Sequence, residues 1–221
     1  MTLPVEILLA EIRRLRLYAT RPMVVALDGR SGSGKSTLAS QVAEAIGATR
    51  VPCDDFFAAG IPAAGWDART PAQRAADAID WRRLRAEAIE PLRAGKTARW
   101  LAFDFAGGPR HDGSYPLERV PTERAPSEVI LLDGAYSARP ELADLIDLAV
   151  LVEATSLLRQ ERLAARENPQ SLAVWQARWG AAEDFYFTQI RPPSSYNLVL
   201  TTGGVKDPGI RLPQSPGFGP D

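Results

Sequence analysis

The sequence has few lysines, one cysteine, no long apolar run and almost no net charge. Three of its 26 basic residues are lysines, at positions 35, 96 and 206, so a lysine inside a motif stands out. The single cysteine, Cys53, excludes an internal disulfide and fits a reducing compartment. No apolar run approaches the length that crosses a membrane, and Glu6 and Glu11 interrupt the first apolar segment, which excludes a signal peptide.

The overall composition is that of an ordinary globular chain. Its 221 residues are 45% hydrophobic and 24% charged, which is enough for one domain with a core. The formal net charge of −1 gives no electrostatic reason to expect nucleic acid or a membrane as partner. We therefore expect a cytoplasmic protein, and the oligomeric state, including a homo-oligomer, stays open.

A glycine-rich segment matches the phosphate-binding loop pattern G-x-x-x-x-G-K-S. The apolar residues 23–27 before it have the composition of a strand, and the apolar positions 38, 42 and 46 after it recur on one face of a helix. Strand, glycine loop and helix in this order predict backbone amides that bind phosphate, Lys35 on the β- and γ-phosphates and Ser36 on Mg²⁺. The candidate binding residues are Gly29, Arg30, Ser31, Gly32, Ser33, Gly34, Lys35, Ser36 and Thr37.

In the rest of the sequence, segments that predict strands alternate with segments that predict helices. Residues 2–18 read as an amphipathic packing helix, residues 58–70 as a mobile loop and residues 106–127 as a long surface loop. The alternation predicts an α/β fold of the P-loop NTPase class: a five-stranded, mainly parallel sheet with helices on both faces and a small lid. Further strands are expected at 49–52, 97–105, 129–132, 148–152 and 197–200, and further helices at 71–94, 155–167 and 171–189.

Acidic residues follow two of these strands. Asp54 and Asp55 come after residues 49–52, and Asp133 ends the apolar segment 129–132. Because the carboxyl ends of parallel strands meet at one edge of a sheet, these acids are expected beside the phosphate loop. Asp133 is the candidate to hold Mg²⁺ together with Ser36, directly or through water. Arg159, Arg162 and Arg166 share one face of the helix expected at 155–167.

From about residue 24 to 200 the chain resembles the uridine kinase and phosphoribulokinase branch of the P-loop kinases. The resemblance implies transfer of phosphate from ATP to a hydroxyl of a small molecule. It implies Asp54 as the base, close to Mg²⁺, and Arg162 and Arg166 reaching the phosphates from a lid, with Asp55 the alternative base. The matching segments are the glycine loop, residues 53–57 (CDDFF), the helix after Asp80-Trp81, residues 103–105 (FDF), Asp133-Gly134, the arginine helix and residues 196–199 (YNLV).

The acceptor-binding segments depart from the family pattern. Residues 73–76 (QRAA) contain no acid or histidine, where uridine kinases carry a segment that grips ribose. A nucleoside is the favoured acceptor; a sugar, a pantothenate-like acid or an antibiotic are alternatives, as is a nucleotide-dependent regulatory ATPase. The tryptophans at 66, 175 and 179 are expected in packing roles. The candidate acceptor residues are Asp54, Phe57, Phe103, Phe105, His111 and Arg159.

These expectations divide the chain into three parts. Residues 1–20 are the N-terminal packing helix, and residues 21–201 are the P-loop kinase domain, with its lid around 159–171. Residues 202–221, rich in glycine and proline, are expected to be a disordered tail.

Overall fold

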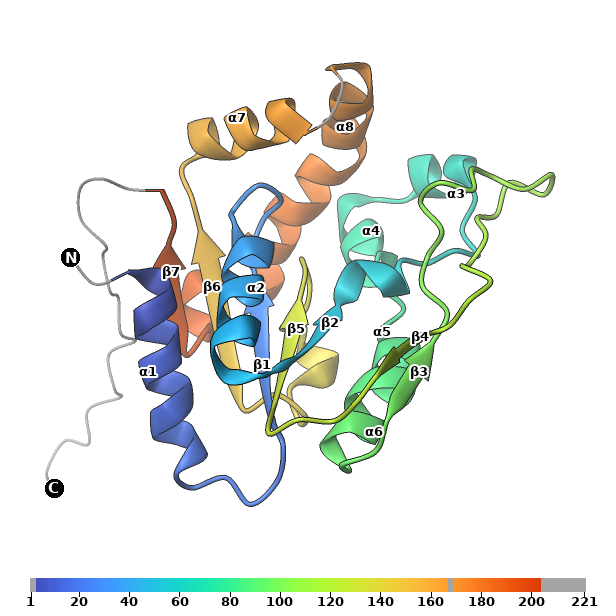
Figure 1. The fold of residues 1–221 in the computed structure, drawn as a ribbon. Coiled ribbons are helices and arrows are strands. Elements are labelled where there is room, and N and C mark those ends of the chain that lie inside the picture. Colours follow the sequence, from blue (N-terminus) through green and yellow to red (C-terminus); the bar gives the residue numbers. More distant parts are fainter. Residues whose placement is uncertain (1–2, 167–168, 204–221) are drawn as a thin grey trace, which may run out of the picture.

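A five-stranded parallel sheet forms the centre of the protein in the computed structural model, which describes residues 3–166 and 169–203 (Figure 1). The strand order is β2-β5-β1-β6-β7, and each neighbouring pair is parallel. The predicted sheet is therefore confirmed. Its strands are β1 (Met23–Asp28), β2 (Thr49–Pro52), β5 (Val129–Asp133), β6 (Leu148–Glu153) and β7 (Leu198–Thr201).

Two helices cover one face of this sheet. They are α1 (Pro4–Arg16) and α2 (Lys35–Ile46). Leu8 of α1 and Val42 of α2 are buried in one apolar cluster with Val25 and Leu27 of β1. Side chains alternate along a strand, so the intervening Val24 and Ala26 belong to the cluster on the opposite face.

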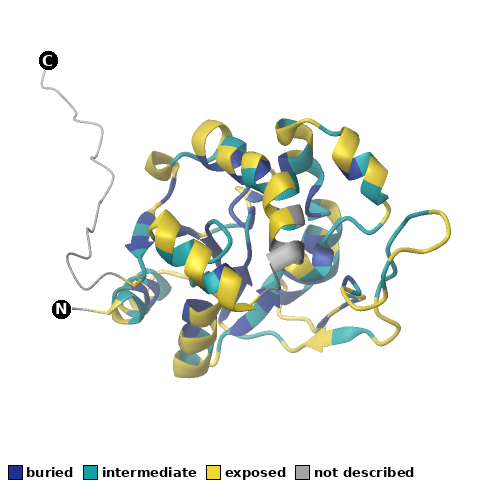
Figure 2. Ribbon diagram, turned by 90° about the horizontal axis from the view of Figure 1, so that it is seen from above, coloured by how far each residue is buried: buried dark blue, intermediate teal, exposed yellow. Residues whose placement is uncertain are grey.

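The opposite face is covered by the helices between β2 and β3 and by the C-terminal helix. Ala78, Leu84, Ala88 and Ala182 from these segments are buried against the sheet. Figure 2 shows buried strands surrounded by helices whose outer surfaces are exposed. The helices of this face are α4 (Pro71–Asp77), α5 (Trp81–Arg83), the π-helical η2 (Leu84–Ile89), α6 (Glu90–Arg93), α8 (Pro169–Phe185) and the π-helical η4 (Tyr186–Ile190).

Short elements and one further helix lie near the ends of the strands. In Figure 1, α7 (Ser156–Arg166) crosses above the carboxyl ends of the strands and leads into α8. The short elements are η1 (Cys53–Phe56), α3 (Ala63–Ala68), η3 (Pro140–Leu142) and η5 (Pro193–Ser195).

Three segments differ from the sequence-based expectation, and one of them is the region 106–127, which was expected as a surface loop and contains a short strand at its end. In the region 97–105 only β3 (Ala98–Trp100) is a strand, and it pairs antiparallel with β4 (Thr122–Arg124) in a separate two-stranded sheet. Its aromatic residues mimic a core strand because Trp100 packs against Phe56. The region 58–70, expected as a loop, contains α3, which is anchored by the burial of Trp66.

Some predictions fall where the structure describes nothing. Asn168, at the expected helix break, and residues 204–221 of the expected tail lie outside the described residues. Disorder of the tail and the division into three parts therefore stay predictions. Within the described ranges no helix is both long and apolar enough to cross a membrane.

Asp28 ends β1 with a fully buried carboxylate that five hydrogen bonds satisfy. Burial raises the pKa of Asp28, and the donated hydrogen bonds oppose this rise. The carboxylate ties the start of the glycine loop to the turn after β5 and to the C-terminal segment. The donors are the N–H groups of Gly29 (2.9 Å), Tyr136 (2.8 Å) and Ala138 (3.1 Å), and the hydroxyls of Tyr186 and Tyr196 (2.9 Å each).

We expect Asp28→Asn to lower the free energy of unfolding by roughly 2–4 kcal/mol, because an amide cannot accept all five hydrogen bonds and its NH₂ faces donors. Urea denaturation followed by circular dichroism measures this change. Asp144→Asn is the control, since Asp144 pairs with Arg85 at the exposed surface and its loss is expected to cost about 0–1 kcal/mol. Equal effects of the two substitutions would contradict the role of Asp28.

Candidate functional site

The glycine loop joins β1 to α2 and is enclosed by backbone from other elements. Gly32 has a φ of +77°, and a Cβ there would lie 2.7 Å from the carbonyl oxygen of Arg159 in α7. A Cβ at Gly29 would overlap the carbonyl oxygen of Val152 in β6. Any side chain at either position would therefore push α7 or β6 away from the loop.

Helix α2 begins at Lys35, directly after the glycine loop, and no side chain caps its first turn. Gly34 precedes it in the left-handed conformation, with a φ of 89°, and its first turn contains no acidic residue. The first turn of a helix leaves N–H groups without intrahelical partners and is the positive end of its dipole. The loop and the start of α2 together have the geometry of a site that can bind an anion such as phosphate.

A cavity of about 540 Å³ lies beside this helix terminus, and we name it the donor cavity. Arg162 of α7 donates to the carbonyl of Gly32 and to the hydroxyl of Thr202, at 3.0 Å in both cases. The arginine helix therefore contacts the loop, and the predicted role of its arginines on the phosphates stays a prediction. Lining residues include Gly32, Gly34, Lys35, Ser36, Thr37, Arg162, Arg166 and Thr202.

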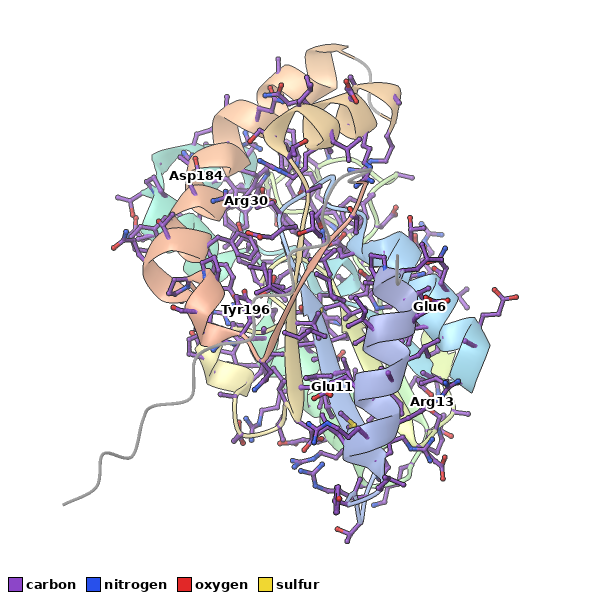
Figure 3. The ribbon with its side chains drawn as sticks, turned by 90° about the vertical axis from the view of Figure 1, so that its left-hand side faces the viewer. Glu6, Glu11, Arg13, Arg30, Asp184 and Tyr196 are labelled. Carbon is purple, nitrogen blue, oxygen red and sulfur yellow. The ribbon has the colours of Figure 1, made fainter. Side chains whose placement is uncertain are left out.

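Two consecutive loop residues are held by α8 instead of facing the donor cavity. Arg30 forms an ion pair with Asp184, and the two side chains lie next to each other in Figure 3. Ser31 donates to Oε1 of Glu183 from its N–H (3.0 Å) and its hydroxyl (2.8 Å). The side chain of Arg30, a predicted nucleotide-binding residue, is therefore directed at α8.

Ser36 and Asp133, predicted to meet at the metal site, are in contact. The Ser36 hydroxyl donates to Oδ1 of Asp133 at 3.0 Å. Oδ2 of Asp133 accepts from the guanidinium of Arg50, which is not among the predicted site residues. It could have been found as the cation in the strand that leads into Asp54.

The donors at this point fit Mg²⁺, which prefers hard oxygen ligands. Within the described residues no group of three or more acidic, histidine or cysteine side chains could hold a metal. Ser36 and Asp133 would therefore supply only part of the coordination shell. The phosphates of a nucleotide and water would supply the rest, as Mg²⁺ usually retains several waters in such sites.

Asp54 and Asp55 follow β2 in η1 and have different surroundings. Oδ2 of Asp55 accepts a hydrogen bond of 2.8 Å from the indole N–H of Trp100. Asp54 is accessible from a cavity. The surrounding protein atoms nevertheless remove part of its hydration, and this raises the pKa of Asp54. The negative charge of Asp133 also raises this pKa, whereas the positive charge of Lys35 lowers it. Asp54 is therefore the acid that is open to a substrate.

The cavity that Asp54 lines has a volume of about 340 Å³, and we name it the acceptor cavity. Most of its lining residues are apolar, and aromatic side chains form part of the wall, with Phe57 and Trp179 in edge-on contact at 5.3 Å between ring centroids. Arg166 lines both this cavity and the donor cavity. Its aromatic residues are Phe57, Phe105, Tyr136, Trp175 and Trp179, and its polar residues are Ser31, Asp54, Arg166 and Glu183.

Trp175, Trp179 and Glu183 were not predicted as site residues. Trp175 and Trp179 were expected only to pack, yet both line the acceptor cavity. Their spacing of four residues, which continues to Glu183, places all three on one face of α8. This four-residue spacing is the feature of the sequence from which a shared role of the three side chains could have been predicted.

Three predicted acceptor residues lie elsewhere. Phe103 is buried behind the cavity wall, edge-on to Phe57 at 5.1 Å between centroids. His111 is exposed in the loop before β4 and does not line the acceptor cavity. Arg159 donates to the carbonyl of Ser31 at 3.4 Å and lines a separate cavity behind the loop. These three residues are close in sequence to the site, but their side chains do not line the acceptor cavity.

Comparison with known proteins supports a kinase. No model of a protein family matches the sequence. A curated uridine kinase from Deinococcus deserti is 27% identical over 207 residues, covering 87% of this chain and 93% of that protein. Because this relative spans nearly all of both chains, the predicted resemblance to the uridine kinase and phosphoribulokinase-like branch is confirmed, as is the prediction of an ATP-dependent small-molecule kinase.

Solved structures show the same fold. A possible uridine kinase from Bacillus stearothermophilus matches with a TM-score of 0.63 and 20% identity, covering 89% of this chain and 96% of that one. The D-glycerate 3-kinase from Cryptococcus neoformans matches with a TM-score of 0.58 and 13% identity, covering 89% and 92%. At these identities the likeness is one of fold.

We expect Lys35→Met to weaken ATP binding by about tenfold or more, because a charge-assisted hydrogen bond contributes roughly 1.5–3 kcal/mol. Lys35 lines the donor cavity and has no described structural partner whose loss would unfold the chain. Titration with a fluorescent ATP analogue measures the affinity. Lys96→Met, at an exposed position after α6, is the control and should bind as the parent protein does. Unchanged affinity in Lys35→Met would contradict the donor cavity.

Proposed function

We propose that this ATP-dependent small-molecule kinase of the uridine kinase-like branch phosphorylates a hydroxyl of an acceptor with a flat aromatic ring, of the nucleoside class. The observation that supports the proposal is the acceptor cavity. It places one open carboxylate, Asp54, in a space of about 340 Å³ whose mainly apolar lining includes several aromatic side chains. Its size is that of a small-molecule site, with few polar groups to orient the ligand.

The aromatic walls favour a planar ring over a purely polar acceptor. Phe105 is 67% exposed, although it contacts Phe103 and Phe57, so its face is available for stacking. Trp179 contacts Phe57 and Trp66 edge-on, which leaves it fixed as a wall of the cavity. Stacking of a base on such side chains contributes about 1–3 kcal/mol, as measured by alanine substitution in nucleic-acid-binding proteins.

The transfer itself depends on position and charge. In this proposal the loop amides and Lys35 bind the β- and γ-phosphates of ATP in the donor cavity. Asp54 orients the acceptor hydroxyl and accepts its proton, and Arg162 and Arg166 of α7 stabilise the transferred phosphoryl group. Mg²⁺ at Ser36, with Asp133 in support, would supply charge neutralisation. Phosphoryl transfer needs little covalent chemistry from the protein, so these interactions can carry it.

Helix α7 would also act as the lid. It holds Arg162 against the loop and Arg166 at the junction of the two cavities. A lid over the γ-phosphate keeps water from replacing the acceptor hydroxyl. The proposal includes the cytoplasm as the place of action, where ATP and Mg²⁺ are available.

Asp54→Asn is expected to slow acceptor phosphorylation by roughly 10²–10⁴-fold, because it removes proton acceptance while keeping the shape. ATP binding should persist. Asp55→Asn is the matched control and should have a smaller effect, since Asp55 is held by Trp100. A reversed order would make Asp55 the base.

The pH dependence provides a second readout of the same base. The raised pKa of Asp54 means that its base form is lost at a higher pH than for an ordinary carboxyl group. The kcat/KM of the parent protein should therefore fall as the pH drops through this raised value. An acid limb at the ordinary carboxyl pKa would argue against Asp54.

An acceptor screen tests the substrate class. Release of ADP is measured with nucleosides, sugars, pantothenate-like acids and aminated antibiotics, and mass spectrometry identifies the phosphorylated product. We expect nucleosides to be accepted, and Trp179→Ala to raise the acceptor KM by about fivefold to a hundredfold without changing the KM for ATP. Trp81→Ala is the control, because Trp81 packs beneath Arg82 in α5.

The other outcomes of the screen are equally specific. A sugar or acid as preferred acceptor would contradict the aromatic assignment and leave the kinase assignment intact. ATP hydrolysis at the full rate without any acceptor would identify a regulatory ATPase.

A further inference from the structure

Arg50 lies on the edge strand β2, opposite the strand that carries Asp133. In the parallel register, Arg50 pairs with Leu131 and Pro52 pairs with Asp133. Val51 is buried in the core on the face away from α2. Because side chains alternate along a strand, Arg50 is directed to the α2 face, where the phosphate-binding helix begins.

The guanidinium of Arg50 contacts both sides of the proposed metal site. Its Nε donates to Oδ2 of Asp133 at 3.0 Å, and its Nη2 donates to the same oxygen. Its Nη1 donates to the Ser40 hydroxyl at 3.0 Å, and that hydroxyl donates to the carbonyl of Ser36 at 2.9 Å. One side chain therefore links β2, the end of β5 and the first turns of α2.

The charges at this point are paired. The side chain of Asp133 is 2% exposed, and a buried carboxylate is stable only with a cation or several donors beside it. Arg50 is a cation in direct contact with Asp133, whereas Lys35 acts on Asp54. The planar fork of arginine suits this place, because three of its nitrogens donate in fixed directions.

The two carboxylate oxygens of Asp133 have different hydrogen-bond partners. Oδ2 is taken by two hydrogen bonds from Arg50, and Oδ1 accepts from the Ser36 hydroxyl. A carboxylate that is neutralised and hydrogen-bonded in this way is a weak ligand for a hydrated cation. Mg²⁺ gives up its water reluctantly and needs strong anionic ligands to do so.

We propose that Arg50 is a positioning residue of the metal site: it turns Oδ1 of Asp133 toward Ser36 and prevents a free divalent cation from binding before the nucleotide. The phosphates of ATP then supply the negative charge that the nucleotide-free site lacks, so the cation enters together with ATP. This inference rests on the Mg²⁺ site of the proposed function, and it is independent of the acceptor.

Binding of Mn²⁺ to the nucleotide-free protein tests the inference. The concentration of free Mn²⁺ is measured by electron paramagnetic resonance with the parent protein and with Arg50→Met, which keeps an apolar stem of similar length. We expect Arg50→Met to bind Mn²⁺ about tenfold or more tightly than the parent protein, because the repelling guanidinium is gone and Oδ2 is released. The double variant Arg50→Met/Asp133→Asn should lose this binding.

Arg21→Met is the matched control. Arg21 forms an ion pair of the same kind with Asp147, with contacts of 2.9 and 2.8 Å, near the amino ends of the strands. This variant also removes an Arg–Asp pair but should bind Mn²⁺ as the parent protein does. If Arg21→Met gained the same Mn²⁺ affinity, a general change of charge would explain the result and the inference would be overturned.

Two further outcomes would overturn it. One is equal Mn²⁺ affinity of the parent protein and Arg50→Met; the other is Mn²⁺ binding that persists in the double variant. Should Arg50→Met fail to fold, Arg50→Lys carries the test: a single ammonium releases part of Oδ2, so its Mn²⁺ affinity must exceed that of the parent protein. No acceptor or turnover enters these measurements, so a failed acceptor screen and a failed Mn²⁺ test are distinguishable.

Discussion

The buried carboxylate of Asp28 is the constraint on which the rest of the site depends. A charged group without water must be satisfied by hydrogen bonds, because an unpaired buried charge costs several kcal/mol. Asp28 meets this requirement with donors from three separate segments: the start of the glycine loop, the turn after β5 and the C-terminal tyrosines. Satisfying one carboxylate therefore places the loop, the turn and the C-terminal helix relative to one another. The turn includes Tyr136, whose φ of 67° is unusual for a residue with a side chain, and its N–H donates to Asp28.

The position of the C-terminal helix then connects the two cavities. Tyr186 is bound to Asp28 just after α8 ends, and this anchors the helix beside the glycine loop. Glu183 and Asp184 can then hold Ser31 and Arg30 of the loop. The same helix presents its tryptophans to the acceptor cavity. The donor and acceptor cavities thus share one support, and Arg166 of α7 lines both of them.

Much of the fold and half of the site could be predicted from the sequence, because the features concerned are local. The glycine loop between residues 29 and 34 is readable since a strand, glycines and a helix start lie within one short segment. The contact of Ser36 with Asp133 follows from parallel strands that end at the same edge. The region 97–105 was misjudged because an aromatic segment packs equally well beside a sheet as within it.

The sequence by itself determined the strands, the phosphate loop and the acids at the strand ends, because backbone conformation and hydrophobic periodicity act over a few residues. Only the tertiary structure decided which of these side chains face a ligand. Asp54 is open and Asp55 is held by Trp100, although the two are neighbours in the chain. Arg50 is bound to Asp133, 83 residues away, and Trp179 lines a cavity with Phe57. Such roles depend on contacts between remote segments, which form only when the core packs and its buried charges find their partners.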